Sequence, residues 1–328
     1  MKVLVYGAGV IGCYLTHVLC AAGNDVTLLA RGKWKDTLET RGLEIRHHLQ
    51  RRTTLDRPRI IGAIPDERFD AAFAVLPYHQ MPDILGDLAA VDSPLVVPVG
   101  NNFSPAEMER AIKARSKAPK TVLFGFQATA GEHQAERIVC ERLGAGTMDI
   151  GALHALPSRD LRLSLEAAFR GTGYRLHWQS DMEAYLICHA AAILPIGYAV
   201  YADGGDLRAS TPAQRKAMMA ASREAYDMLA AQGLPIRPVG DDGFYRGGAK
   251  YAAMKLLYFL MGKTEMGDLI ACAHCRRASR EMELIDEGFA EVRAKTPDFP
   301  MPAWDALRAS MPPWEEIHRT YGGTRPGA

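Results

Sequence analysis

The first thirty residues predict a strand, a helix and a second strand. Residues 3–6 form a short apolar run typical of a buried strand, and apolar residues recur at helical spacing over 11–22. Gly23 and Asn24, which commonly end helices, precede a second apolar run at 26–30. One βαβ unit is therefore predicted, and such a unit requires a right-handed crossover within a parallel sheet.

The apolar pattern changes its period part-way along the chain. Strand-like runs recur at 73–76, 95–99 and 121–124 with helix-like segments between them, which favours a doubly wound parallel α/β sheet of the Rossmann type. Later apolar stretches have helical period, at 183–201, 212–232, 247–261 and 268–294. We therefore predict a dinucleotide-binding domain over 1–178 and a second, all-helical substrate domain over 179–328.

Composition narrows the classes of partner. The 328 residues include 39 Lys and Arg against 38 Asp and Glu, a net charge of +1, so no charge excess favours nucleic acid or a membrane surface. Six cysteines spread over this length favour a reducing compartment, and we expect a cytoplasmic protein without a metal site. The expected partner is a small molecule, and a homodimer stays open.

A glycine pattern follows the first predicted strand. Gly7-Ala8-Gly9-Val10-Ile11-Gly12 has the G-x-G-x-x-G spacing and stands between a strand and a helix, which is the context expected of a dinucleotide phosphate loop. The helix N-terminus then faces the pyrophosphate. The alternative is a glycine-rich turn without a ligand. That alternative is disfavoured, because three glycines at this spacing lower helix stability unless a ligand must approach the backbone closely.

The residues after the second predicted strand favour NADP(H) over NAD(H). An NAD site usually places a carboxylate there for the ribose 2′-hydroxyl, whereas an arginine accommodates a 2′-phosphate. This chain has Arg31, then Lys33 and Lys35, and no carboxylate between Val26 and Lys35. We predict that Arg31 and Lys33 bind the 2′-phosphate.

With the glycine loop, Ala30-Arg31-Gly32 and Arg41-Gly42-Leu43-Glu44-Ile45, the chain resembles the ketopantoate reductase (2-dehydropantoate 2-reductase) family. The resemblance continues through residues 125–131 and 149–151 and covers most of the chain, with the C-terminal third matching least. It implies a Rossmann domain, a helical second domain, and reduction of an α-keto acid by NADPH in the interdomain cleft.

The resemblance also places the cofactor contacts. They fall on Gly7, Ala8, Gly9, Val10, Ile11, Gly12, Arg31, Leu76, Pro77, Asn101 and Ala130. One of these positions and one neighbour depart from the family: Pro77 stands where the family has a lysine, and Asn102 replaces the glycine that usually follows the asparagine.

The catalytic positions of the family do not match. Its catalytic lysine opens the second domain, with asparagines at four-residue steps, but neither residue type occurs from 183 to 200. Reduction of a ketone needs a proton donor, which contributes about 10²–10⁴-fold in rate. His189 is the nearest titratable side chain and is our candidate donor; an ordinary helix histidine is the alternative.

Several other polar groups are weaker candidates. The resemblance would bring Tyr185, Tyr78 and His79 near the cleft, Lys250 or Lys255 could supply a relocated cation, and Glu281 or Glu283 could contact the ribose. Packing or solvent exposure is the commoner role for such side chains. Cys272-Ala273-His274-Cys275 resembles half of a zinc site, but the two further ligands that such a site needs do not occur at comparable spacing. We therefore expect these cysteines to be core thiols.

Two functions follow from these patterns. The first is an NADPH-dependent oxidoreductase that transfers hydride to a small carbonyl, keto-acid-like, or imine substrate. The second is a non-catalytic protein that binds NADP(H) as a sensor or interaction module, which the missing lysine and asparagines favour.

Overall fold

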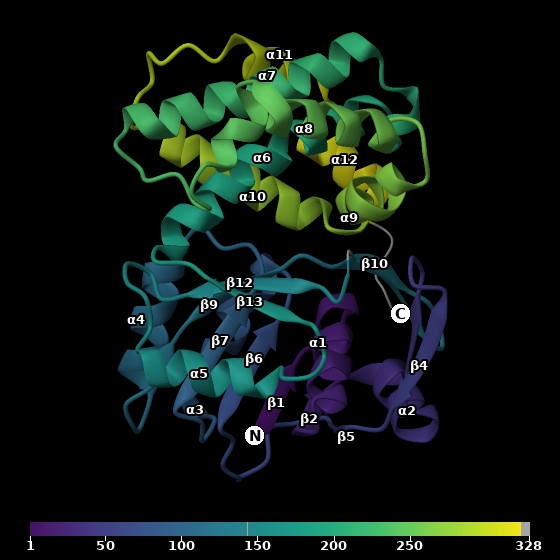
Figure 1. The fold of residues 1–328 in the computed structure, drawn as a ribbon, viewed down its shortest axis with the longest axis vertical. Helices are drawn as coiled ribbons and strands as arrows, with labels where there is room; N and C mark the ends of the chain where they lie inside the picture. Colours follow the sequence, from purple (N-terminus) through teal and green to yellow (C-terminus); the bar gives the residue numbers. More distant parts are fainter. Residues whose placement is uncertain (143, 323–328) are drawn as a thin grey trace. The chain divides into compact units, whose positions relative to one another are not determined.

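The computed structural model describes residues 1–142 and 144–322, with the side chain of residue 269 excepted, and divides the chain into two compact units. The first unit ends at Met182 and the second begins at Glu183 (Figure 1). This division lies four residues beyond the boundary expected from the sequence. Each unit has its own hydrophobic interior.

The first unit is built on a twisted, mostly parallel sheet in the order β13-β12-β9-β7-β6-β1-β2-β5 (Figure 1). Its strands are β1 (Lys2–Tyr6), β2 (Asp25–Leu29), β5 (Arg59–Ile61), β6 (Ala71–Val75), β7 (Leu95–Val99), β9 (Phe124–Gln127), β12 (Thr147–Gly151) and β13 (Arg175–Trp178), and β8 (Thr121–Val122) pairs with β7. One pairing, β9 with β12, is antiparallel. The chain runs outward from β1 to β2 and returns to β6 on the other side, as a doubly wound sheet does.

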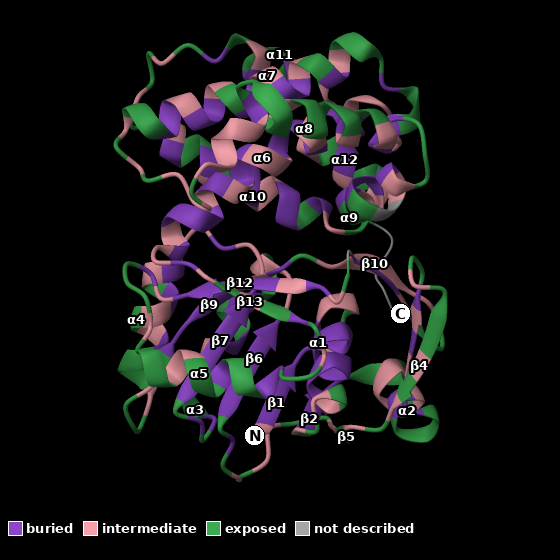
Figure 2. Cartoon of the chain, viewed as in Figure 1, coloured by how far each residue is buried: buried purple, intermediate pink, exposed green. Residues whose placement is uncertain are grey.

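Helices cover the sheet, and its central strands are buried (Figure 2). They are α1 (Val10–Ala21), α2 (Gly32–Arg41), α3 (Leu85–Ala90), α4 (Pro105–Arg115) and α5 (Arg159–Ala168), with a 3₁₀ turn at Tyr78–Ile84. Strand β6 reads Ala-Ala-Phe-Ala-Val and is buried at every position, which explains its continuous apolar run in the sequence.

A second, smaller sheet was not expected from the sequence. It has the order β10-β11-β3-β4, from β10 (Ala130–His133), β11 (Ile138–Glu141), β3 (Leu43–His47) and β4 (Arg52–Asp56). Its strands are four or five residues long and only partly apolar, so their periodicity is weak. The predicted strand at 121–124 is divided between β8 and β9.

The secondary structure of the second unit is helical, with no strand among its described residues, as the apolar period predicted. It contains α6 (Met182–Ala202), α7 (Pro212–Ala231), α8 (Gly248–Met261), α9 (Ala273–Arg277), α10 (Ser279–Arg293), α11 (Pro302–Ser310) and α12 (Trp314–Tyr321), with short turns at Leu207–Ala209, Asp241–Tyr245 and Asp268–Cys272. The stretch predicted as one helix over 268–294 is interrupted near Ala278, whose backbone leaves the helical region. The predicted α/β class with a helical second part is confirmed.

Helix α6 is the one described helix that is long and apolar enough to cross a membrane by length and composition. Of its most apolar window, 72% is buried inside the protein, which is the behaviour of a core helix. Tyr198 and Tyr201, in its last turns, are almost completely buried, and Tyr198 donates to the Asp286 carboxylate at 2.5 Å.

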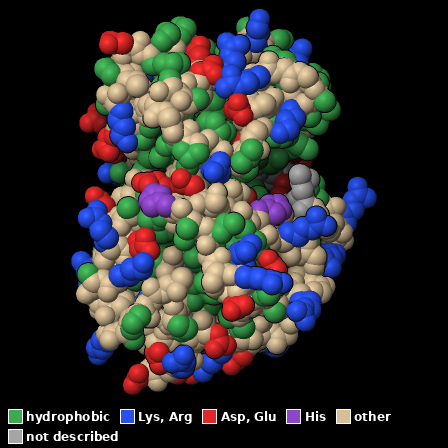
Figure 3. All heavy atoms as spheres, turned by 60° about the vertical axis from the view of Figure 1, so that its left-hand side comes forward, with side chains coloured by type: hydrophobic (Ala, Val, Ile, Leu, Met, Phe, Trp, Pro, Cys, Tyr) green, Lys and Arg blue, Asp and Glu red, His purple; other side chains and the backbone are tan. Residues whose placement is uncertain are grey.

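Charges of both signs are distributed over both units, as Figure 3 shows for one face. None of the six cysteines, all of which lie in the described part of the chain, forms a disulfide. Cys272 and Cys275 are buried, which agrees with packing thiols. Among the described residues, no group of three or more His, Cys, Asp or Glu side chains could hold a metal ion.

Candidate dinucleotide site

The candidate site lies at the carboxyl edge of the parallel sheet, where β1 stands between β2 and β6. This is the point at which the direction of strand addition reverses, and ligands of doubly wound sheets bind there. Gly7 follows β1, Leu76 follows β6 and Asn101 follows β7 after Gly100. Residues distant in the sequence are thus brought to one edge because the parallel strands end together.

Gly7 and Gly12 are required by the fold itself. Gly7 has φ +113°, and a Cβ there would lie 2.2 Å from the carbonyl oxygen of Val75. A Cβ on Gly12 would lie 1.9 Å from the carbonyl oxygen of Gly7. The turn after β1 and the close packing of α1 on the sheet therefore exclude any side chain at either position.

Gly9 differs from both. Its φ of −74° is open to any residue, and a Cβ there would have no heavy atom of the described residues within 4 Å. The residue is exposed and is the N-cap of α1. Nothing inside the protein demands glycine here, so the missing side chain leaves the helix N-terminus open to an approaching group.

The N-terminus of α1 is suited to an anion. Gly9 provides no capping side chain, and the first turn contains no acidic residue. The first helical hydrogen bond runs from Cys13 N to the Gly9 carbonyl at 2.8 Å, so helix geometry leaves the amides of Val10, Ile11 and Gly12 without an intrahelical acceptor. Such amides and the positive end of the helix dipole fit a pyrophosphate.

The structure brings the remaining predicted backbone contacts to this loop. Leu76 Cδ2 would lie 3.0 Å from a Cβ on Gly7, and the Leu76 carbonyl 3.4 Å from one on Gly100, the residue before Asn101. A Cβ on Gly131 would meet Val10 Cγ1 at 3.0 Å, so β10 brings Ala130 beside the first turn of α1.

Pro77 and Asn102, the two departures from the family pattern, have structural roles. Pro77 precedes the 3₁₀ turn Tyr78–Ile84 with φ −55°, which its ring favours, and it offers no donor in place of a lysine. Asn102 is buried, and its Oδ1 accepts from Ser104 N at 2.9 Å at the start of α4. The amide of Asn102 is thus committed to the fold.

Arg31, the predicted 2′-phosphate ligand, is held by the side chain of Tyr6 at the end of β1. Its Nη2 donates to Tyr6 Oη at 2.5 Å, and its guanidinium lies 5.6 Å from the centre of the Tyr6 ring. Tyr6 Oη in turn donates to Asp87 Oδ2 at 2.8 Å. Burial, then the bond to Asp87 and its charge, raise the pKa of Tyr6 to about 12, so the phenol keeps its proton at neutral pH.

The basic residues after Arg31 divide into two kinds. Lys35 pairs with Glu39 at 2.7 Å one turn along α2, which offsets its charge. Lys33 is exposed in the first turn of α2, where there is no acidic residue. Arg31, as N-cap, and Lys33 therefore add their charges to the positive end of the α2 dipole.

Trp34 is a contact that the sequence did not indicate. Its Nε1 donates to the Ala8 carbonyl at 2.9 Å, and its ring packs edge-on against His133 of β10 with centroids 4.3 Å apart. The indole thus fixes the glycine loop from the α2 side. A tryptophan at helical spacing gives no sign of this role before the fold is known.

His189, the predicted proton donor, lies on α6 with its ring stacked on Tyr185 at a centroid distance of 6.4 Å. Burial, and next the nearby His274, lower its pKa to about 4. The imidazole is therefore neutral at pH 7 and is poorly suited to act as a cationic acid. The role of His189 as proton donor stays a prediction.

The weaker candidates have more ordinary surroundings. Tyr78 Oη and Ser104 Oγ lie 3.1 Å apart, His79 and Lys255 are exposed, and Lys250 donates to the Gly240 carbonyl at 2.8 Å. Glu283 accepts from His318 Nε2 at 2.8 Å, while Glu281 is buried. None of these contacts assigns a catalytic role.

Comparison with known proteins agrees with this geometry. Residues 3–155 match the family model described as "Ketopantoate reductase PanE/ApbA", a span that includes the glycine loop, Arg31, Asn101 and Ala130. The N-terminal unit is thus similar to the ketopantoate reductase PanE/ApbA family over most of its length. "Uncharacterized oxidoreductase YkpB" of Bacillus subtilis (strain 168) is 33% identical over 88 residues, and that match spans 27% of this chain and 28% of the relative's length.

Solved structures extend the likeness of fold to both units. A PanE/ApbA family ketopantoate reductase from Ralstonia eutropha JMP134 is similar with a TM-score of 0.72 at 16% identity, covering 98% of this chain and 100% of that one. The 2-dehydropantoate 2-reductase from Methylococcus capsulatus has a TM-score of 0.68 at 15% identity, and the match covers 100% of both chains. D-mandelate dehydrogenase, in a ternary structure with NADH and anilino(oxo)acetate, has a TM-score of 0.72 at 14% identity. This match covers 98% of this chain and 99% of that one.

Proposed function

We propose that this protein of the ketopantoate reductase fold is an NADPH-dependent oxidoreductase that transfers hydride to a small carbonyl compound, keto-acid-like, or to an imine. Similarity of the N-terminal unit to the PanE/ApbA family supports a nicotinamide-dependent reaction at a C=O or CH–OH group. The glycine loop supplies the amides for a pyrophosphate, and the cofactor, when bound, supplies the hydride.

The observation that carries the choice of NADPH is the fixed position of Arg31. Its guanidinium is bonded to Tyr6 Oη, and Tyr6 is bonded to Asp87, so the cation is oriented before a ligand arrives. A guanidinium binds a phosphate dianion through charge-assisted hydrogen bonds, and no carboxylate lies between Val26 and Lys35 to accept from a ribose hydroxyl. D-mandelate dehydrogenase, whose structure contains NADH, makes the direct comparison of the two cofactors necessary.

Calorimetric titration with NADPH and NADH tests this choice. We expect the wild-type protein to bind NADPH more tightly, and Arg31→Gln to weaken NADPH binding at least about tenfold while NADH binding changes little. Lys35→Gln is the matched control, because it removes one cation of α2 that already pairs with Glu39. Equal losses in both variants, or a preference for NADH, would contradict the proposal.

Turnover is tested by following NADPH absorbance with a panel of 2-oxo acids, ketones and imines. Because the pKa of His189 is about 4, we propose that its neutral ring hydrogen-bonds the substrate. We expect His189→Ala to lower kcat/KM by about tenfold, less than the 10²–10⁴ typical of a lost general acid. Unchanged kinetics would remove His189 from the site.

A non-catalytic NADP(H) sensor is the second candidate. It is favoured by the absence of lysine and asparagine from 183 to 200 and by the low pKa of His189. A sensor would bind NADPH and leave it unoxidised with every compound of the panel. If any one of these compounds oxidises NADPH with the wild-type protein but not with Arg31→Gln, the protein is an enzyme.

A further inference from the structure

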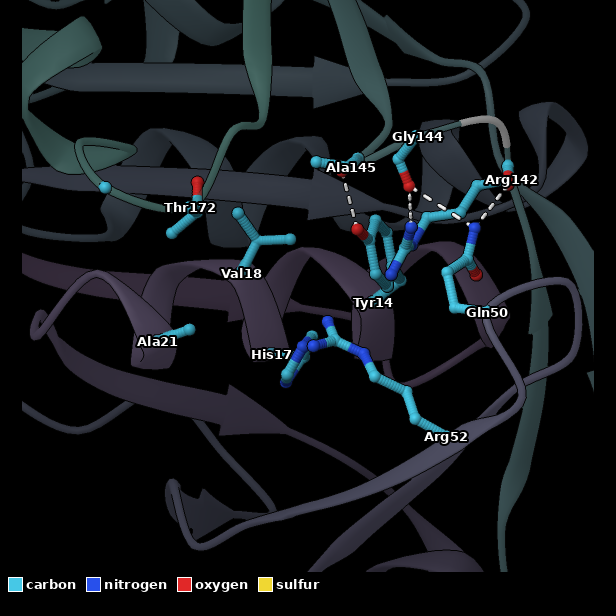
Figure 4. Close-up of a pocket in the computed structure, with 11 residues that line it drawn as sticks. Tyr14, His17, Val18, Ala21, Gln50, Arg52, Arg142, Gly144, Ala145 and Thr172 are labelled. Carbon is cyan, nitrogen blue, oxygen red and sulfur yellow. Dashed lines mark hydrogen bonds between the residues drawn. The ribbon is translucent and has the colours of Figure 1, made fainter.

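The first unit contains a cavity of about 360 Å³ that includes no residue of the glycine loop. Tyr14 and His17 of α1 form one wall, Arg52 comes from β4, and Arg142 follows β11 (Figure 4). The remaining lining is small or apolar apart from Gln50 and Thr172. A volume of this size accommodates a small metabolite.

The lining is cationic. Two guanidiniums, of Arg52 and Arg142, and the His17 ring line the cavity, and no carboxylate does so among the described residues. Figure 4 shows the Arg52 side chain extending toward His17. Asp56, the carboxylate bonded to His17 Nδ1 at 2.7 Å, lies outside the lining. Like charges brought together in this way are stabilised when an anion joins them.

Arg142 is fixed and largely desolvated. It is 5% exposed, its Nη2 lies 3.1 Å from His47 Nδ1, its Nη1 donates to the Gly144 carbonyl, and its guanidinium lies 4.7 Å from the centre of the Tyr14 ring. No carboxylate of the described residues pairs with it, and its Nε is buried without a hydrogen-bond partner. A buried cation without a counter-charge is costly, so the protein keeps it here at the expense of stability.

Two further observations point the same way. Gln50 Oε1 is also buried without a partner, although Gln50 Nε2 donates to the Arg142 carbonyl at 3.1 Å. Beside the cavity, the pKa of His47 is lowered to about 3 by burial and then by the charges of His17, Arg142 and Arg52. Arg142, Arg52 and His17 thus lie close enough together to act on the same ring beside this cavity.

We propose that this cavity is a second ligand site, which binds a small phosphomonoester. The guanidiniums of Arg142 and Arg52 and the His17 ring receive the phosphate dianion, and Tyr14 and Thr172 border it. Val18, Ala21 and Ala145 form an apolar wall for the organic part. Since α1 carries the glycine loop at one end and this cavity along its later turns, the two sites are separate.

The test is calorimetric titration of the full chain with glycerol 3-phosphate, with malonate and with glycerol. We expect binding of glycerol 3-phosphate at or below about 1 mM, weaker binding of malonate and none of glycerol. Arg52→Gln should weaken glycerol 3-phosphate binding at least about tenfold. Arg57→Gln, which removes an exposed arginine of the same segment that does not line the cavity, should leave it within about twofold.

Saturating NADP⁺ separates this site from the glycine loop. We expect glycerol 3-phosphate binding to persist with NADP⁺ present, and the ring resonances of His17 and His47 to shift on its addition. No heat at about 10 mM, tighter binding of malonate, equal losses in Arg52→Gln and Arg57→Gln, or displacement by NADP⁺ would overturn the proposal. Binding of glycerol 3-phosphate by Arg52→Gln is measured without hydride transfer. A failure of this proposal can therefore be distinguished from a failure of the proposed oxidoreductase activity.

Discussion

Gly9 and Gly12 lack a side chain for different reasons, although the sequence pattern treats them alike. A methyl group at Gly12 would collide with the Gly7 carbonyl, whereas one at Gly9 would meet no described atom of the protein. The third glycine of the pattern is therefore a packing residue, whereas the packing does not require the second, which we expect to be a binding residue. The distinction predicts separable effects on stability and on cofactor affinity.

We expect Gly12→Ala to lower the free energy of unfolding by about 1–3 kcal/mol, because the backbone must shift to admit the methyl group. Gly9→Ala should change stability by less than about 0.5 kcal/mol but weaken NADPH binding at least about tenfold. Urea unfolding and calorimetry measure the two quantities. A destabilised Gly9→Ala protein, or one with unchanged affinity, would refute the division of roles.

Tyr6 holds Arg31, the residue that we propose binds the 2′-phosphate. Its phenol stays protonated because its pKa is about 12, so it donates to Asp87 and accepts from Arg31. We expect Tyr6→Phe to release the guanidinium and reduce the ratio of NADPH to NADH affinity by about three- to tenfold. Asp87→Asn, which keeps a hydrogen-bond acceptor for the phenol, should reduce it less. The same ratio in Tyr6→Phe and wild type would show that Arg31 needs no support.

At the scale of elements, α1 connects the dinucleotide loop to the second sheet. Gln127 Nε2 of β9 donates to the Ile11 carbonyl at 3.2 Å, and Tyr174 Oη donates to Gln127 Oε1 at 2.9 Å. Further along the helix, the His17 ring lies 5.0 Å from that of His47 in β3. The first turn is thus anchored by side chains that the glycine pattern does not include.

The histidine of β3 makes stability depend on pH. The pKa of His47 falls from 6.5 to about 3 on folding, so the unfolded chain binds more protons between these values and stability falls as pH drops through this window. His189 adds a contribution of the same sign between 6.5 and about 4. We expect His47→Gln to reduce the loss of stability from about pH 7 to pH 5 by about 1–2 kcal/mol.

Urea unfolding at both pH values measures this difference. His79→Gln, which changes an exposed histidine of the first unit, is the control and should leave the loss as in the wild type. A His47→Gln protein that is destabilised equally at both pH values would show that the ring matters for packing alone.

At the scale of the whole molecule, the cofactor loop and the α6 helix belong to different compact units. Ligand that binds only the native first unit stabilises that unit by mass action, by about 2.7 kcal/mol at a hundredfold excess over Kd. We expect NADPH to slow amide hydrogen exchange in β1, α1 and β6 and to have a smaller effect on α7 and α10. Equal slowing in all five would show that the two units open together.

The sequence by itself determined the class of fold and the cofactor loop. Both follow from local patterns: apolar runs of strand length, helical spacing, and glycines whose spacing is fixed by a single turn. Arg31 was also recognisable, because it follows the second strand directly. His189 was found by position alone, and the sequence did not show that burial would lower its pKa.

Only the tertiary structure decided what surrounds these residues. Arg31 lies 25 positions and Asp87 lies 81 positions after Tyr6 in the sequence. The three side chains meet because β1, β2 and α3 come together around one sheet. Arg142, which lines the cavity, lies 95 positions from His47, and the two side chains meet because β11 pairs with β3. Contacts between distant segments leave no periodic trace in a single sequence, so packing alone creates them.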